Sequence, residues 1–278
     1  MKGKKNEETK PAAARPPRVL VPELAAYRGS SEEILLRKEE TAHVRSRRLR
    51  EGDEVVALDG KGERARACLT RSGTALKVLS FEEDPGLLSP SSSAFFASLP
   101  GEPDLRVTVL LACAEPARVE WAIEKGTECG AAGFVLLSTA RSQKAHVTAL
   151  EARLSRLSRI AAEATKQCDR TIVPGIEGPE EIEEFLRGEE GRRHARRPFL
   201  LTDPWGAPLV ETISSASFSS SLAGGVAVAV GPEGGFTPAE ISLFEGFGAL
   251  RVSLGPRILR LETAVVAALT LLVGRPDR

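Results

Sequence analysis

Apolar residues run almost without interruption through several short segments in the second half of the chain. These segments are residues 106–113, 133–139, 197–203, 224–230 and 249–254. Runs of this kind predict strands that are buried on both faces. Residues 117–130 predict a helix closed by glycine, and residues 262–273 predict a strongly apolar helix. A single apolar stripe predicts one further helix through Leu150, Leu154, Leu157, Ala161, Ala164 and Cys168. Alternating strands and helices predict an α/β fold, with a mainly parallel sheet covered by helices.

The first third of the chain follows a different pattern. Strands are predicted at 18–22, 54–69 with a turn at 59–62, and 75–81, and a short helix is predicted near 39–45. We therefore expect four parts: a disordered polar tail at 1–17, a small β-rich domain at 18–84, a Pro/Ser/Gly-rich linker at 85–104 and the α/β domain at 105–278. Residues 188–197 (GEEGRRHARR) predict an exposed loop.

Two Gly-Pro loops follow two of the apolar runs. Residues 231–240 read GPEGGFTPAE, and residues 254–264 read LGPRILRLETA. Open α/β sheets bind ligands at the carboxyl ends of their strands, and glycines let a ligand approach the backbone closely. Thr237, Pro238 and Glu240 predict a capping box that fixes the start of the next helix. One such loop is commonly a simple connection, but two of them, the second with Arg257 and Arg260, favour a binding site.

The ligand expected there carries no phosphate. The chain contains neither GxxxxGK[ST] nor GxGxxG, and the carboxylate of Glu233 would repel a pyrophosphate. Composition excludes several other classes of site. The four cysteines and three histidines are scattered, which argues against a metal and for a reduced, cytoplasmic protein. No apolar run is long enough to span a membrane.

Charge is balanced overall, with 38 basic and 38 acidic residues, so its distribution is more informative than its sum. Arg45, Arg47, Arg48 and Arg50 form a basic cluster. Such a cluster is commonly a solvated face, and the alternative is a patch that contacts phosphate.

Several ordered motifs carry a resemblance to a known family. IEKGTECG (123–130), STARS (138–142), RIAAEATKQCDR (159–170), VGPEGGFTPAEI (230–241) and LGPRILRLETAVVAAL (254–269) resemble the bacterial 16S rRNA (uracil-N3)-methyltransferases of the RsmE type. The resemblance spans about 105–273 and extends more weakly over 43–62. It implies a SPOUT methyltransferase domain with a C-terminal trefoil knot, preceded by a PUA-like β-barrel that binds RNA. It also implies a cytoplasmic homodimer, and 16S rRNA of the assembled small ribosomal subunit as the substrate.

The resemblance also implies the residues that bind the cofactor, and the chemistry of the reaction suggests candidates for the other roles. S-adenosylmethionine would be bound by loops containing Leu201, Thr202, Gly231, Glu233, Gly234, Leu254, Gly255, Ile258 and Leu259. The candidate catalytic residues are Arg257 and Arg260, which would stabilise the uracil anion, and Glu262, ranked below them as a proton acceptor. The candidate RNA contacts are Arg18, Arg48, Arg141 and Lys144. Lys166, Asp169 and the pair Ser46-Arg47 depart from the family pattern.

Three alternatives stay open from the sequence. A ribose 2′-O-methyltransferase of the same superfamily would place Asn and Arg in its first catalytic motif, and residues 120–130 lack that arrangement. A non-catalytic RNA-binding protein with this fold would not bind S-adenosylmethionine. A nucleotide-dependent enzyme of the Rossmann type would bind NAD or ATP instead.

Overall fold

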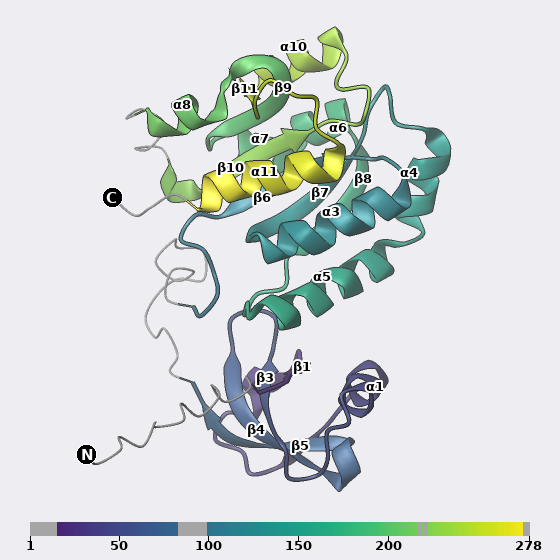
Figure 1. Cartoon of the computed structure of the whole chain (residues 1–278), viewed down its shortest axis with the longest axis vertical. Coiled ribbons are helices and arrows are strands. Elements are labelled where there is room, and N and C mark those ends of the chain that lie inside the picture. The colour runs from purple at the N-terminus through teal and green to yellow at the C-terminus, as the bar shows by residue number, and fades with distance from the viewer. Residues whose placement is uncertain (1–15, 83–98, 216–217, 219–221, 275–278) are drawn as a thin grey trace, which may run out of the picture. The chain divides into compact units, whose positions relative to one another are not determined.

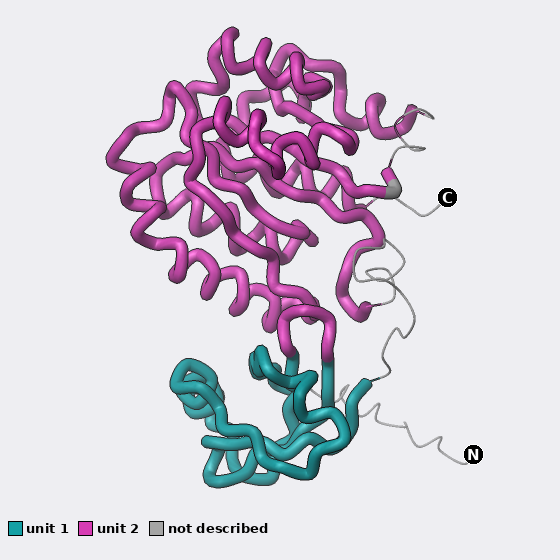
Figure 2. Tube along the Cα trace, turned by 180° about the vertical axis from the view of Figure 1, so that it is seen from behind, with its two compact units in different colours: residues 1–58, 64–82 teal, residues 59–63, 83–278 magenta. Residues whose placement is uncertain are grey.

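The computed structural model describes residues 16–82, 99–215, 218 and 222–274 (Figure 1). The chain divides into two compact units (Figure 2). Unit 1 comprises residues 1–58 and 64–82, and unit 2 comprises residues 59–63 and 83–278. The predicted tail at 1–17 and linker at 85–104 lie largely outside the described residues.

Unit 1 is built on a five-stranded mixed sheet with the order β1-β3-β4-β5-β2. The strands are β1 (Arg18–Leu20), β2 (Glu33–Leu35), β3 (Glu54–Leu58), β4 (Arg64–Thr70) and β5 (Ala75–Phe81), with helix α1 (Lys38–Ser46) and the 3-10 turns η1 (Leu24–Tyr27) and η2 (Arg71–Gly73). Alternate residues of the strands face one core, as Val55 and Ala57 do in β3 and Ala65, Ala67 and Leu69 in β4. The predicted strands and the helix are therefore present, and β2 is an addition.

Unit 2 contains a six-stranded sheet with the order β11-β9-β10-β6-β7-β8, in which every pairing is parallel. Its strands are β6 (Val107–Ala112), β7 (Ala131–Ser138), β8 (Gly175–Glu181), β9 (Phe199–Pro208), β10 (Val226–Val230) and β11 (Leu250–Ser253). Along β10, Val226, Val228 and Val230 face one core, whereas Ala227 and Ala229 face a second core. Each central strand is thus apolar on both sides, which explains its unbroken apolar sequence.

Helices cover both faces of this sheet (Figure 1). They are α3 (Pro116–Glu128), α4 (Lys144–Glu151), α5 (Leu154–Cys168), α6 (Ile182–Arg187), α7 (Glu189–Ala195), α8 (Leu209–Ser214), α10 (Pro238–Gly246) and α11 (Leu261–Val273), with the 3-10 turn η3 (Leu222–Gly224). Core residues of α3, α5, α8 and α11 pack on one face, and those of α6 and α10 pack on the other. The domain is therefore a three-layer α/β/α structure. None of the described helices is long and apolar enough to cross a membrane.

Two predictions about helices were wrong. The stripe from Leu150 to Cys168 was predicted to be one helix, but the chain ends α4 at Glu151 and starts α5 at Leu154. Residues 188–197 were predicted to be a loop, but they contain α7. Gly191 and His194 are buried in α7, and a side chain at position 191 would overlap the backbone of Phe185 and Leu186. Tertiary packing therefore stabilises a helix whose charged sequence gives no amphipathic signal over so short a length.

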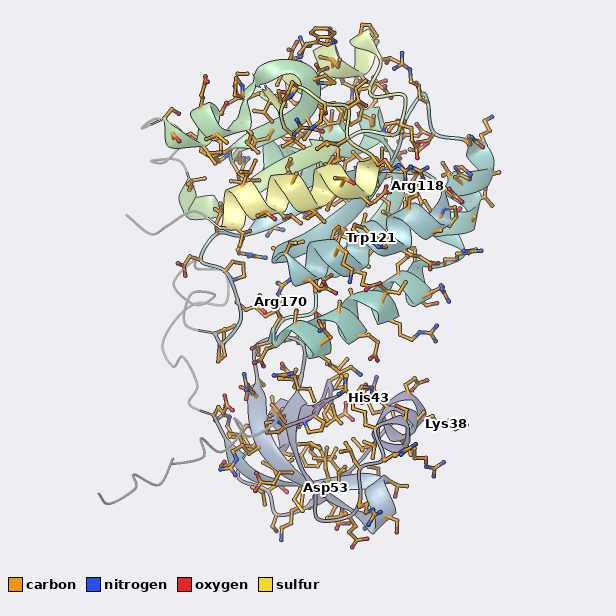
Figure 3. All side chains as sticks on the ribbon, in the orientation of Figure 1. Lys38, His43, Asp53, Arg118, Trp121 and Arg170 are labelled. Carbon is orange, nitrogen blue, oxygen red and sulfur yellow. The ribbon has the colours of Figure 1, made fainter. Side chains whose placement is uncertain are left out.

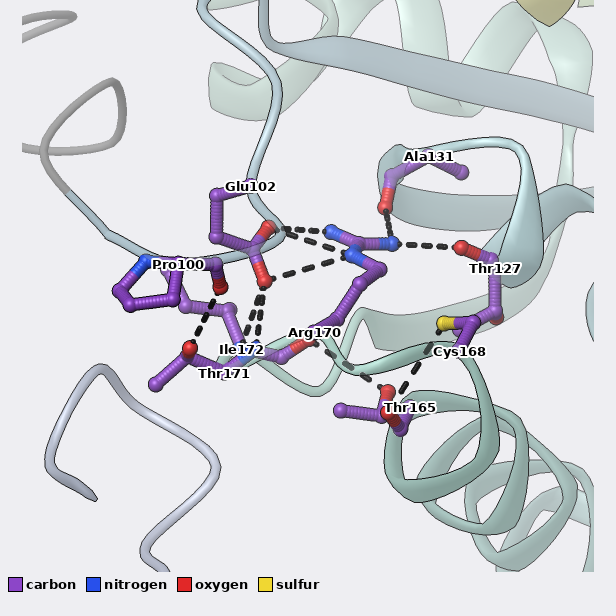
Figure 4. A network of polar contacts seen from close by, with 9 residues as sticks. All are labelled: Pro100, Glu102, Thr127, Ala131, Thr165, Cys168, Arg170, Thr171 and Ile172. Atoms are coloured by element: carbon purple, nitrogen blue, oxygen red, sulfur yellow. Dashed lines mark hydrogen bonds and ion pairs between the residues drawn. The ribbon is translucent and has the colours of Figure 1, made fainter. Parts of the chain in front are cut away.

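The end of the predicted linker is anchored in unit 2 by a buried ion pair (Figure 4). Arg170 Nη2 lies 2.7 Å from Glu102 Oε2, and the two side chains are 3% and 2% exposed. Arg170 Nη1 also donates to the carbonyls of Thr127 (2.9 Å) and Ala131 (2.8 Å). Glu102 Oε1 accepts hydrogen bonds from the amides of residues 171 and 172, at 2.9 and 2.8 Å. Segment 99–104, the end of α3, the start of β7 and the turn after α5 are thus joined through one guanidinium group.

The imidazole of His194 provides a test of this packing that depends on pH. Burial, and then the nearby charge of Arg197, lower the pKa of His194 to about 4. The unfolded chain therefore binds a proton at this ring between about pH 6.5 and pH 4 that the folded chain does not, so stability falls as pH falls through that range. We expect this ring to cost the unchanged protein roughly 3 kcal/mol of stability between pH 7 and pH 4, and His194→Phe to abolish that part of the loss. Urea unfolding at both pH values measures this difference, and equal losses in the two proteins would contradict it.

Candidate active site

A cavity of about 620 Å³ opens at the carboxyl ends of β9 and β10 in unit 2. Three chain segments form its walls, residues 202–205, 230–238 and 254–259, and Leu261 and Ala264 of α11 add an apolar surface. The volume lies in the range of small-molecule sites. Its position is the one that the fold makes available for a ligand.

The first wall forms where the residue-by-residue pairing between β9 and β11 is interrupted. Arg251 pairs with Leu201, but the next residue of β11, Val252, pairs with Ala207. Residues 202–206 therefore leave the ladder, and four of them line the cavity. Thr202 Oγ1 donates to the carbonyl of Ala229 (2.9 Å), and Asp203 forms an ion pair with Arg251 (3.1 Å). These contacts hold the excursion in place.

The second wall is the loop GPEGG (231–235). Its turn closes through a hydrogen bond from the amide of Gly235 to the carbonyl of Pro232 (2.8 Å), and Gly235 has a φ of 69°. A Cβ at position 231 would lie 3.1 Å from the ring of Phe236, so glycine allows the close packing of this turn. Arg141 Nη1 donates to the carbonyl of Gly234, which fixes the far end of the loop.

The predicted capping box follows this loop. It fixes the start of α10 and also connects the loop to the segment after β7. Glu240 Oε2 accepts from the amide of Thr237 (2.7 Å), and Thr237 Oγ1 accepts from the amide of Glu240 (3.3 Å). Glu240 Oε1 also accepts from the amide of Ala140 (2.7 Å). The segment after β7 is therefore tied to the loop after β10 by Glu240 and by Arg141, and the cavity wall is held from two directions.

The third wall follows β11. Gly255 has a φ of 113°, which favours glycine, and its amide donates to Ser253 Oγ (3.2 Å). Arg257 and Ile258 follow, and the side chain of Ile258 is among the most exposed of the large apolar groups. This wall therefore contributes a charged side chain, Arg257, and an apolar side chain, Ile258, to the same cavity.

The structure brings most of the predicted cofactor residues together. The cavity is lined by Thr202, Gly231, Glu233, Gly234, Leu254, Gly255, Ile258 and Leu259. Leu201 is the exception, because it is fully buried in the core beneath the wall. Of the candidate catalytic residues, Arg257 lines the cavity, Arg260 is the N-cap residue of α11, and Glu262 lies in the first turn of α11.

The four candidate RNA contacts are divided between the two units. Arg18 and Arg48 belong to unit 1, whereas Lys144 begins α4 in unit 2. Arg141 lines the cavity and holds Gly234, so it has a role in the loop whether or not it also meets RNA.

Sequence reasoning missed Arg118, Asp203 and Trp205. Arg118 on α3 lies 3.3 Å from the carboxylate of Glu233 and 3.9 Å from that of Glu262. Asp203 and Trp205 line the cavity within the excursion from the ladder. Asp203 could have been found from its place directly after an apolar run, but nothing in the sequence marked Arg118.

The chemistry available at this edge of the sheet is positioning and electrostatics. Burial raises the pKa of the Cys113 thiol, which follows β6, to about 12, so the thiol stays protonated at neutral pH and is no nucleophile. The described residues contain no group of three His, Cys, Asp or Glu side chains placed to hold a metal ion. The cavity itself offers backbone groups, three carboxylates and three guanidinium groups.

Family models, sequence relatives and solved structures resemble this chain over most of its length. The RNA methyltransferase domain family matches residues 101–273, and the RNA methyltransferase PUA domain family matches residues 36–78. The chain is 29% identical to ribosomal RNA small subunit methyltransferase E of Mycobacterium bovis, covering 80% of this chain and 79% of the relative. It is 29% identical to the protein of that name from Bacillus subtilis, covering 84% and 86%. A crystal structure of ribosomal RNA small subunit methyltransferase E from Neisseria gonorrhoeae bound to S-adenosyl methionine aligns with a TM-score of 0.74 at 24% identity, covering 92% and 96%.

Proposed function

Because the chain belongs to the RNA methyltransferase family, we propose that it transfers the methyl group of S-adenosylmethionine to N3 of a uridine in 16S rRNA. The observation that carries the proposal is the cavity, whose three walls contain eight of the nine residues predicted to bind that cofactor. The relatives named above act on small-subunit rRNA, and one was crystallised with S-adenosyl methionine. The small ribosomal subunit is the substrate that we assign, and the cytoplasm is the compartment.

The residues present fit a nucleoside without phosphates. Gly231 and Gly235 keep side chains out of the second wall, and main-chain amides and carbonyls are the groups that recognise an adenine edge. The carboxylates of Asp203 and Glu233 suit a ligand with a positive charge. When bound, the cofactor supplies a sulfonium methyl group, an electrophile with a neutral leaving group.

Arg257 is the residue that we assign to the substrate uracil. N3 is an imide nitrogen that carries a proton at neutral pH, so methylation requires the charge that develops on the ring to be stabilised. A guanidinium group at the cavity can donate to a uracil oxygen and favour the anion. The N3 atom lies on the pairing edge of the base, so the uridine must be unpaired or extruded to reach the cavity.

RNA binding is assigned to basic residues of both units. The PUA domain family matches residues 36–78, which include Arg48, and we place Arg48 and Arg18 of unit 1 in contact with phosphate. Arg141 and Lys144 would act near the cavity. Contacts of this type weaken with salt and position the RNA without selecting its sequence.

We also propose that the active form is a homodimer and that the C-terminal segments form a trefoil knot. Trp205 and Ile258, two cavity residues, are 88% and 85% exposed, and Val210 and Leu250 nearby in the chain are also exposed. Trp205 and Ile258 lie at the same cavity, and apolar surface gathered and exposed in this way favours an interaction site. A second copy that covered them would close the cavity against water.

Calorimetric titration and mass spectrometry test the proposal. We expect S-adenosylmethionine to bind with a stoichiometry of one per chain, and NAD and ATP not to bind. Small-subunit rRNA from cells lacking the protein should have lost one 3-methyluridine, which the purified protein restores on isolated subunits. Failure of S-adenosylmethionine to bind would favour a non-catalytic RNA-binding protein, and a methyl group on a ribose oxygen would favour the 2′-O-methyltransferase.

A further inference from the structure

Arg118 connects three carboxylates behind the loop 231–235. Its guanidinium group lies 3.4 Å from Glu115, the N-cap residue of α3, 3.3 Å from Glu233 in the loop and 3.9 Å from Glu262 on α11. Figure 3 shows Arg118 on α3, next to the N-terminal end of α11. Three segments that are distant in the sequence are thus joined at one side chain.

The two carboxylates beyond α3 differ in their access to the cavity. The side chain of Glu233 is 49% exposed and lines the cavity. The side chain of Glu262 is 15% exposed and does not line it. Its Oε2 is shielded from solvent and accepts no hydrogen bond from any described residue. This oxygen is therefore poorly placed to take a proton from a base in the cavity.

A shielded carboxylate is costly unless a cation lies beside it. Among the described residues, the cation within 4 Å of Glu262 is Arg118. The same nitrogen of Arg118, Nη1, approaches Glu233. Glu262 therefore holds the guanidinium group of Arg118 in place. The guanidinium group in turn holds Glu233, which lies in the second wall of the cavity.

We propose that Arg118 and Glu262 are positioning residues, which hold Glu233 and the loop 231–235 in the shape that binds the cofactor, and that Glu262 accepts no proton from the uridine. This inference takes the identity of the ligand from the proposed function. It replaces the candidate role of Glu262 as proton acceptor with a role exerted through Arg118.

A double-mutant cycle tests the inference. The variants are Arg118→Met, Glu262→Gln and the double variant, with the dissociation constant of S-adenosylmethionine measured by calorimetry and methyl transfer to isolated small subunits measured at saturating cofactor. Each single change is expected to raise the dissociation constant about tenfold, and the double change also about tenfold, because residues in one network are not additive. The transfer rate at saturation and its pH profile stay within about threefold of the unchanged protein.

A matched ion pair between α3 and α5 serves as the control. Arg156 Nε on α5 lies 2.7 Å from Glu120 on α3, and neither residue lines the cavity. Arg156→Met and Glu120→Gln should leave the dissociation constant unchanged. Arg118→Lys, which keeps the charge, should give an intermediate value and guards against misfolding of Arg118→Met.

Two outcomes would overturn the inference. A loss of transfer rate above a hundredfold in Glu262→Gln with an unchanged dissociation constant would make Glu262 the proton acceptor. Additive effects of the two single changes would mean that Arg118 and Glu262 act independently. If the unchanged protein does not bind S-adenosylmethionine, the proposed function fails and the inference fails with it; if the unchanged protein binds and the cycle is additive, the inference alone fails.

Discussion

Arg257→Ala lowers the rate of methyl transfer at saturating S-adenosylmethionine about 100-fold, the loss typical of removing one donor to a developing anion. Arg257 lines the cavity, and its guanidinium group has no ion pair or side-chain hydrogen bond with any other described residue. Its donors are therefore available for the uracil oxygens. Because the contact would strengthen as charge develops on the base, its loss should appear in the rate rather than in cofactor affinity. Single-turnover transfer to isolated small subunits measures the rate, and calorimetry measures the affinity.

Two variants make this result specific. Arg257→Lys keeps the positive charge without the planar donors and should fall between the unchanged protein and Arg257→Ala. Arg159→Ala removes an exposed arginine from α5, away from the cavity, and should have no effect on either quantity. If Arg257→Ala instead weakens the binding of S-adenosylmethionine more than tenfold and leaves the rate at saturation unchanged, Arg257 belongs to the cofactor side of the cavity.

The parts of the fold that were predictable from the sequence are those governed by local pattern. β6, β7 and β10 are buried on both faces, so their residues had to be apolar throughout. The start of α10 was predictable because a capping box depends on residues only three apart. The second Gly-Pro loop could be expected to line the same cavity because it follows β11, which ends at the same edge of the sheet as β9 and β10.

The parts that were missed depend on contacts distant in the sequence. β8 contains Gly175, Gly178, Pro179 and three glutamates, and it forms at the edge of the sheet because β7 offers it a partner. The excursion at 202–206 depends on how β11 pairs with β9. Arg118 has a role only because α3, the loop 231–235 and the start of α11 meet at its guanidinium group. The contact between these three segments could not be predicted from any spacing of residues in the sequence.

Two of the departures from the family pattern have explanations in the structure, whereas nothing in the structure explains the pair Ser46-Arg47. Lys166 is buried, and its ammonium group lies 2.7 Å from Glu163, one turn earlier on α5. Asp169 is the C-cap residue of α5 and has a φ of 70°, a left-handed conformation that Asp tolerates better than most residues. Both changes lie beside Arg170, whose contacts with Glu102 are intact. The motif at 159–170 thus includes a structural element of the domain, in addition to any role in the site.

Glu102→Ala lowers the free energy of unfolding of unit 2 by about 3–5 kcal/mol, the cost of leaving one partner of a buried ion pair without the other. The change leaves the guanidinium group of Arg170, which is 3% exposed, without its carboxylate partner. It also removes the acceptor for the amides of residues 171 and 172. The unfolding midpoint should fall by roughly 10 °C for a domain of this size, as followed by circular dichroism.

Two comparisons distinguish burial from simple loss of an ion pair. Glu190→Ala removes the pair with Arg193, whose side chains are 48% and 64% exposed, and should cost less than about 1 kcal/mol, because water screens exposed charges. Arg170→Met combined with Glu102→Ala should be more stable than Glu102→Ala alone, since the double variant leaves no buried charge without a partner. A cost for Glu102→Ala equal to that of Glu190→Ala would mean that the network in Figure 4 contributes no more than a surface pair. A large cost that the double variant does not reduce would place the stabilisation in the hydrogen bonds of Glu102 to the backbone rather than in its charge.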